Sequence, residues 1–201
     1  NEYLMQVTDE KDLAGLPDYV REAAKATAKQ KGKEGWVFTL QAPSYGPFMQ
    51  YADNRELRKK LFIAYNSRSF QGNKNDNSAI IAKIVNLRYE RANLLGYKTH
   101  ADFVLEESMA GSTDKVQSFL NELVTYARPA AERQLVELTT YAKAHGFSED
   151  KLQAWDNSYY AEKLKKEKYD LDDETLKPYF KLENVLNGAF TVANKLYGIT
   201  F

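Results

Sequence analysis

The sequence predicts an all-α fold, an irregular multi-helix assembly with one long helix and at most one short strand. Apolar residues recur at three- and four-residue spacing over several stretches, which is the period of a helix with one buried face. Residues that favour helix starts and stops flank these stretches. Only one segment, residues 36–40, alternates in the manner of a β-strand.

The longest predicted helix covers residues 112–146, and the other segments are expected to pack against it. Its apolar positions share one face: Val116, Phe119, Leu120, Leu123, Ala127, Ala130, Leu135, Leu138 and Ala142. Ser112 or Thr113 can cap the start, and Gly146 suits a left-handed stop. Pro129 lies inside this pattern and predicts a kink or break near residues 127–128.

The first 70 residues are expected to form two helices around the strand candidate. One helix opens at Pro17, where the missing backbone donor costs nothing, and ends near Gly32. Two prolines within residues 42–47 predict a turn. Asn54 or Asp53 then caps the second helix.

After a polar loop, residues 76–95 are expected to form a second strong helix that stops at Gly96. Its apolar residues are predicted to face inward: Ile80, Ile81, Ile84, Leu87, Leu94 and Leu95. Thr99 and Asp102 form a variant of the capping box that begins the next helix.

Three helical segments are predicted toward the C-terminus. They cover residues 156–168, a stretch opening at residues 172–174, and residues 182–197 before Gly198. No repeat of 34 or 40 residues is present, which argues against a helical solenoid.

Composition excludes several classes of function. Lys plus Arg and Asp plus Glu both total 28, so no net field attracts nucleic acid or an anionic membrane. The sequence has 0 cysteines, which rules out disulfides and thiolate chemistry. No apolar run approaches the ~18 residues of a membrane span. The interpretation places the protein in the cytoplasm, with the periplasm as an alternative.

Metal chemistry finds little support in the residues. His100 and His145 do not form a His-Glu-x-x-His motif, so both are interpreted as structural. Residues 73–77 resemble a calcium loop superficially, but the central glycine and the distal glutamate are missing. They are interpreted as a loop and a helix cap.

Five arginines on predicted helical faces could each bind a peptide carboxylate through a bidentate contact: Arg55, Arg58, Arg68, Arg88 and Arg91. The favoured interpretation is structural, with the arginines tying helices together through Glu56, Glu90 or carbonyl groups. Residues 159–160 and 179–180 are aromatic pairs that could line a peptide groove. Core packing is the default interpretation for them.

Many short segments, in one order along the chain, resemble the zinc oligopeptidase family of thimet oligopeptidase and peptidyl-dipeptidase. They are residues 13–17, 35–41, 43–45, 54–58, 64–65, 87–88, 92–97, 109–110, 155–156, 159–160, 177–180 and 196–201. Residues 169–172 and 196–201 are most similar to the peptidyl-dipeptidase branch.

The resemblance implies a mostly helical protein of two lobes around a deep channel, which cleaves short peptides with one zinc ion. In that family a His-Glu-x-x-His helix and a later glutamate hold the zinc, and the motif glutamate activates water. This sequence stops at Phe201, before that helix would begin. No catalytic, cofactor-binding or metal-binding residue is therefore assigned to it.

Residues 1–201 are accordingly expected to be a single helical segment of a larger peptidase, upstream of its zinc helix. The segment would supply channel wall and scaffold, hold no zinc and be inactive alone, while the parent protein releases C-terminal dipeptides from short peptides. An apolar surface that the missing lobe would cover could pair two fragments. The alternative is a self-contained helical peptide-binding or interaction domain with no enzymatic role.

Overall fold

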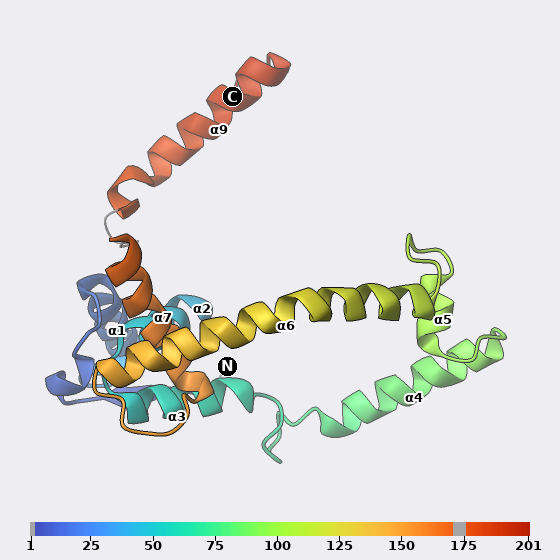
Figure 1. Ribbon diagram of the computed structural model, residues 1–201. Helices are drawn as coiled ribbons and strands as arrows, with labels where there is room; N and C mark the ends of the chain where they lie inside the picture. Colours follow the sequence, from blue (N-terminus) through green and yellow to red (C-terminus); the bar gives the residue numbers. More distant parts are fainter. Residues whose placement is uncertain (1–2, 171–175) are drawn as a thin grey trace. The chain divides into compact units, whose positions relative to one another are not determined.

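The computed structural model describes residues 3–170 and 176–201 (Figure 1). They fall into two compact units, Asn1–Tyr160 and Ala161–Phe201. The predicted all-α class is confirmed, because helices dominate both units. The helix expected to open at residues 172–174 lies outside the described residues. No helix among the described residues is long and apolar enough to span a lipid bilayer.

The first unit contains a small antiparallel sheet of two strands, β1 (Met5–Val7) and β2 (Trp36–Phe38). Met5 lies opposite Phe38, and Val7 lies opposite Trp36. The strand predicted at residues 36–40 is confirmed, but the limit of one strand is wrong. A strand of three residues shows only one alternation of polarity, which is too little for a periodicity argument to detect.

The main core forms where this sheet meets the first helices. These are η1 (Glu10–Leu13), α1 (Asp18–Gln30), α2 (Ala42–Tyr51) and α3 (Arg55–Asn66). Its buried residues are Met5, Val7, Leu13, Leu16, Val20, Ala24, Phe38, Leu40, Phe48, Ala52, Leu61 and Ala64. Phe38 and Phe48 meet edge to face with ring centroids 4.6 Å apart, which is a favourable aromatic geometry.

Helix α2 replaces the turn that was predicted from Pro43 and Pro47. Pro43 lies in the first turn, where a backbone N–H would have no partner within the helix. Pro47 removes one donor inside the helix, but its fixed φ suits helical geometry. Burial of Phe48 and Met49 offsets the lost bond.

Three further helices follow in the first unit: α4 (Ser78–Leu94), α5 (His100–Leu105) and α6 (Thr113–Ala144). The predicted caps are confirmed, since Thr99 and Asp102 form a capping box and the Ser112 hydroxyl accepts a hydrogen bond from the Lys115 amide. Gly146 has the expected positive φ of 89°. The break expected near Pro129 does not occur, because α6 continues through this residue.

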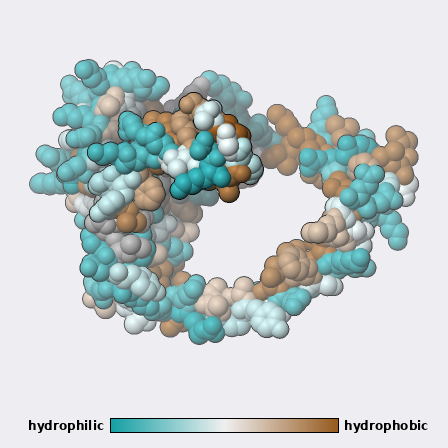
Figure 2. All heavy atoms as spheres, turned by 90° about the horizontal axis from the view of Figure 1, so that it is seen from above, coloured by the Kyte–Doolittle hydropathy of each residue, from teal (hydrophilic) through white to brown (hydrophobic). Residues whose placement is uncertain are grey.

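The apolar faces of α4 and α6 are largely exposed, which contradicts the inward orientation predicted for them. Ile80, Ile81 and Ile84 expose 56%, 58% and 43% of their surface, and Leu87, Leu94 and Leu95 are exposed too. In α6 only Ala142 is buried, so this helix is not the element around which the others pack. Brown apolar patches accordingly reach the surface in Figure 2.

A smaller cluster joins the C-terminal end of α6 to the start of α7 (Ala154–Tyr169). Its buried residues are Ala142, Phe147, Tyr159 and Tyr160. The rings of Tyr159 and Tyr160 pack edge to face, with centroids 5.0 Å apart. This cluster fixes the turn after α6, where the candidate site lies.

The second unit contains η2 (Lys177–Tyr179) and α9 (Leu182–Tyr197). Helix α9 ends as predicted at Gly198, which has a φ of 68°. The ring of Phe190 stacks on that of Phe201, with centroids 4.5 Å apart. Glu162 pairs with Lys165 at 2.9 Å in the part of α7 that belongs to this unit.

Candidate functional site

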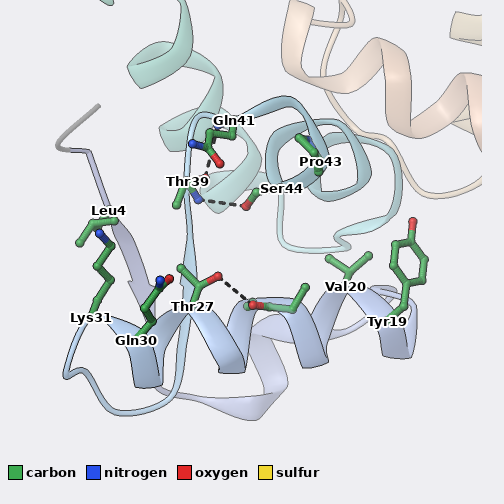
Figure 3. A pocket seen from close by; sticks show the side chains of 12 residues that line it. Leu4, Tyr19, Val20, Thr27, Gln30, Lys31, Thr39, Gln41, Pro43 and Ser44 are labelled. Carbon is green, nitrogen blue, oxygen red and sulfur yellow. Dashed lines mark hydrogen bonds between the residues drawn. The ribbon is translucent and has the colours of Figure 1, made fainter.

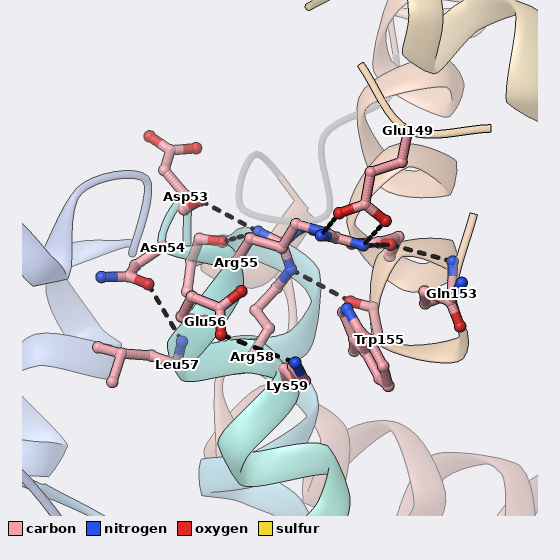
Figure 4. A network of polar contacts seen from close by, with 12 residues as sticks. Asp53, Asn54, Arg55, Glu56, Leu57, Arg58, Lys59, Glu149, Gln153 and Trp155 are labelled. Atoms are coloured by element: carbon pink, nitrogen blue, oxygen red, sulfur yellow. Dashed lines mark hydrogen bonds and ion pairs between the residues drawn. The ribbon is translucent and has the colours of Figure 1, made fainter. Parts of the chain in front are cut away.

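The most deeply buried polar contacts of the first unit join α3 to the start of α7 (Figure 4). Arg58 exposes 1% of its surface and Asp156 exposes 0%. Nη2 of Arg58 lies 3.2 Å from Oδ1 of Asp156. Arg58 also donates from Nη1 to the Ala52 carbonyl at 2.7 Å and from Nε to the Trp155 carbonyl at 3.1 Å.

Arg55, one turn earlier on α3, binds the same carboxylate from the side nearer solvent. Its Nε and Nη2 donate to the two carboxylate oxygens of Asp156, both at 2.9 Å. Its terminal nitrogens also pair with both oxygens of Glu149. The backbone N–H of Gln153 completes the site by donating to Oδ2 of Asp156 at 3.0 Å. We refer to Arg55, Arg58, Glu149 and Asp156 as the ionic clasp.

Aromatic rings frame the ionic clasp and hold its guanidinium groups in place. The Arg58 guanidinium lies 4.0 Å from the ring centre of Tyr159, and the Tyr159 hydroxyl donates to Asp53 at 2.7 Å. The guanidinium carbon of Arg55 lies 5.4 Å from the ring centre of Phe147. These cation–π contacts cover the arginines with apolar surface, which strengthens their attraction to the carboxylate.

The electrostatics favour the charged forms of Asp156 and Arg55. Burial raises the pKa of Asp156, but hydrogen bonds from Arg55, the Gln153 amide and Arg58 outweigh burial and leave this pKa below its ordinary value. The hydrogen bond to Asp156 raises the pKa of the Arg55 guanidinium. A carboxylate held by two cations is a poor proton donor or acceptor near neutral pH, so the clasp fits a structural role.

Of the five arginines considered from sequence, Arg55 and Arg58 tie helices together as the structural interpretation expected. Arg58 binds the Trp155 carbonyl, as the expectation of carbonyl partners allowed. The carboxylate partners are Asp156 and Glu149 and not Glu56 or Glu90. Arg91 lies 5.0 Å from the ring centre of Phe103. Arg88 has no hydrogen bond or ion pair with any residue that the structure describes. Arg68 stacks on Tyr65 at 3.7 Å and borders a separate cavity.

The two aromatic pairs considered from sequence differ in how far they are buried. Tyr159 and Tyr160 expose 8% and 9% of their surface and belong to the core, as the default interpretation held. Tyr179 and Phe180, in the second unit, expose 76% and 70%.

The two histidines have separate environments. Nδ1 of His145 lies 2.8 Å from the Tyr141 carbonyl. Nδ1 of His100 is buried and has no hydrogen-bond partner among the described residues. Within residues 3–170 and 176–201, no three His, Cys, Asp or Glu side chains gather in a way that could hold a metal ion.

A cavity of about 400 Å³ lies between α1 and residues 39–44 (Figure 3). Val20, Ala23 and Ala24 provide apolar lining. The Ser44 hydroxyl on its rim already accepts a hydrogen bond from the Thr39 amide at 3.0 Å. This cavity suits a small apolar group, and no acid and base pair for catalysis is present among the described residues that line it.

Sequence reasoning missed Asp156 as a member of the site, because it was interpreted only as the start of a helix. The available signal was the spacing of Arg55 and Arg58, which places two cations on one helical face. Two arginines on a face that also carries Leu61 require a buried anion. The sequence does not indicate which carboxylate supplies it.

The fold is a mainly helical assembly in which the ionic clasp joins α3 to α7. The profile of Peptidase family M3 matches residues 48–201. The match covers more than half of the sequence, and the chain therefore belongs to peptidase family M3. This confirms the family resemblance found in the sequence.

Relatives with assigned names support this membership. The chain is 43% identical over 198 residues to Oligopeptidase A of Escherichia coli (strain K12), covering 96% of this chain and 29% of the relative. It is 36% identical over 199 residues to Dipeptidyl carboxypeptidase of the same organism, covering 97% of this chain and 29% of the relative. The organellar oligopeptidase A of Arabidopsis thaliana is 39% identical over 201 residues, with 96% and 25% covered.

Proposed function

We propose that the longer protein to which this chain corresponds hydrolyses short peptides, and that residues 1–201 supply scaffold and channel wall. The observation that carries this proposal is the alignment of 96% of the chain with Oligopeptidase A at 43% identity. The chain spans only 29% of that relative. The ionic clasp supports a scaffold role, because its charges satisfy one another.

The proposal includes one zinc ion in the longer protein. The residues that the structure describes do not fit such an ion, because they contain no cluster of three metal-binding side chains. Its ligands would therefore come from outside the residues that the structure describes. When bound, zinc would supply a polarised water molecule for attack on the peptide bond.

The finer proposal concerns where the peptide is cut. The segments at residues 169–172 and 196–201 resemble the peptidyl-dipeptidase branch and favour release of C-terminal dipeptides. Internal cleavage is the alternative, since identity is higher with Oligopeptidase A than with Dipeptidyl carboxypeptidase. A peptide with an amidated C-terminus separates the two, because dipeptide release is expected to require the free carboxylate.

The 201-residue chain alone is expected to show no peptide hydrolysis and to hold no stoichiometric zinc. The measurement is zinc content after dialysis, together with cleavage of a fluorogenic peptide with and without a chelator. A version extended through a His-Glu-x-x-His helix serves as the positive control. One tightly held zinc and chelator-sensitive hydrolysis in the short chain would contradict the proposal.

A self-contained peptide-binding or interaction domain is the alternative, supported by the exposed aromatic residues Tyr179 and Phe180. The reading frame of the gene discriminates between the two proposals. Continuation past Phe201 into a His-Glu-x-x-His helix favours the peptidase, and a stop codon favours the binding domain. The cytoplasm is the proposed location, and the periplasm is the alternative.

The exposed apolar face of α4 is expected to make the 201-residue chain associate with a second copy. Ile81 and Val85, four residues apart on α4, expose 58% and 57% of their surface, and helical residues at this spacing lie side by side. Sedimentation velocity at rising concentration should therefore show a growing dimer fraction. Replacing both residues with glutamate should remove it, whereas Asn86→Glu on the same helix should not. A chain that stays monomeric at every concentration contradicts this expectation.

A further inference from the structure

A second cavity, of about 750 Å³, lies beside the C-terminal end of α3 and residues 71–77. Neither the clasp nor the proposed function uses this cavity. Amide side chains form much of its wall, Arg68 and Lys74 add positive charge, and Tyr3 and Leu40 add apolar surface. No carboxylate is among the described residues that line it.

Arg68 is held in a fixed orientation at the edge of this cavity. Its guanidinium lies 3.7 Å from the ring centre of Tyr65, and that ring stacks on Tyr45 with centroids 4.0 Å apart. Nε of Arg68 donates to the Tyr65 carbonyl at 2.8 Å. Its two terminal nitrogens donate to nothing in the part of the chain that the structure describes. The Arg68 side chain therefore loses less conformational entropy on binding a ligand than an unrestrained arginine would.

The loop that forms the opposite wall is ordered by its own hydrogen bonds. The Asp76 carboxylate accepts from the amides of Gly72 at 2.7 Å and Ser78 at 2.8 Å. The Asn73 side chain accepts from the Asn75 amide at 2.9 Å. Asp76, the one carboxylate of this loop, is thus occupied by backbone donors and does not line the cavity.

Two amide side chains on this wall keep their hydrogen-bonding capacity. Neither the Asn75 nor the Asn77 side chain has a hydrogen bond to a described residue. Both line the same cavity as Arg68. The cavity therefore combines an oriented cation with neutral donors, which is a donor set for an anion and not for a metal cation.

We propose that this cavity binds a carboxylate carried by a peptide, with Arg68 as the principal contact. The paired N–H groups of a guanidinium match the two oxygens of a planar carboxylate. The partly buried Tyr3 would contact the apolar part of the same peptide. The proposal does not depend on the proposed function, because binding is measured without hydrolysis.

The test is a titration of the isotope-labelled 201-residue chain, followed by the backbone amide signals of residues 68–77. N-acetyl-Ala-Leu with a free carboxylate is expected to shift these signals saturably, and its amidated form is not. N-acetyl-Asp-Leu amide tests whether a side-chain carboxylate is an alternative source. Binding of either carboxylate supports the site, and comparison of the two identifies the source.

Arg68→Met should weaken binding of the free acid by about ten-fold or more, as expected for loss of a charge-assisted contact. Arg88→Met is the matched control, because this exposed arginine on α4 does not line the cavity. Circular dichroism of each variant reports whether the fold is intact. The proposal is overturned if neither peptide carboxylate binds, if N-acetyl-Ala-Leu amide binds as tightly as both carboxylate peptides, if Arg68→Met binds unchanged, or if inorganic phosphate binds more tightly than either peptide.

Discussion

Replacing Asp156 with alanine is expected to lower the free energy of unfolding of the first unit by about 3–5 kcal/mol. The variant leaves the guanidinium of Arg58 buried with no carboxylate opposite it, since Arg58 exposes 1% of its surface. Arg55 is affected less, because it keeps the second carboxylate, Glu149, as a partner. Urea unfolding followed by far-UV circular dichroism measures the change.

Glu56→Ala is the matched control, because it removes a carboxylate from the same helix at an exposed position. Glu56 lies 3.9 Å from Lys59, and these side chains expose 74% and 42% of their surface. Such a pair contributes about 0–1 kcal/mol. If both variants lost the same stability, the clasp would not stabilise the fold.

The effect of Asp156→Ala should also depend on pH, with a definite sign. The pKa of Asp156 in the folded chain lies below its ordinary value, so its contribution is complete above the unfolded pKa of about 3.9. The contribution is lost as pH falls from there through the folded pKa. The difference in unfolding free energy between wild type and Asp156→Ala should therefore shrink in acid.

Gly15→Ala is expected to cost about 2–5 kcal/mol of stability. Gly15 has a φ of 83°, and a Cβ atom there would clash with the Tyr51 carbonyl and lie 2.8 Å from Oδ1 of Asp53. A left-handed conformation costs an alanine about 1–2 kcal/mol, and overpacking adds about 1–3 kcal/mol. Urea unfolding measures the total.

Gly32→Ala separates these two contributions. Gly32 has a similar φ of 64°, but a Cβ atom there would have no neighbour within 4 Å. Only the conformational cost of about 1–2 kcal/mol is expected. Equal losses in the two variants would show that the contact of Gly15 with Tyr51 and Asp53 is loosely packed.

Local features of the fold were predictable from the sequence because their causes are local. A cap needs one hydroxyl or amide within three residues of a free N–H group, and Asn54, Thr99 and Ser112 satisfy this condition. The positive φ values of Gly96 and Gly146 also have a local cause, because each glycine directly follows the end of a helix. Helix starts and stops were therefore predicted more accurately than their packing partners.

Packing was less predictable because it depends on segments that are distant in sequence. The apolar residues of α4 indicate that it needs a partner, but their spacing does not identify one. The ionic clasp shows the same limit, because Asp156 lies 98 residues after Arg58. The turn predicted from the prolines of α2 was wrong for another reason. Burial of Phe48 in the core outweighed the local preference of proline for a turn.

The position of the ionic clasp also affects how much the intervening chain can change in length. The clasp joins residues 55–58 to residues 149–156, and α4, α5 and α6 all lie between these segments. The entropy of closing such a loop grows only logarithmically, by about 0.6 kcal/mol for each doubling of its length. Insertions or deletions between α4 and α6 would therefore change the cost of closing the clasp very little. The chain between α4 and α6 is therefore free to diversify in length while the ionic clasp keeps its geometry.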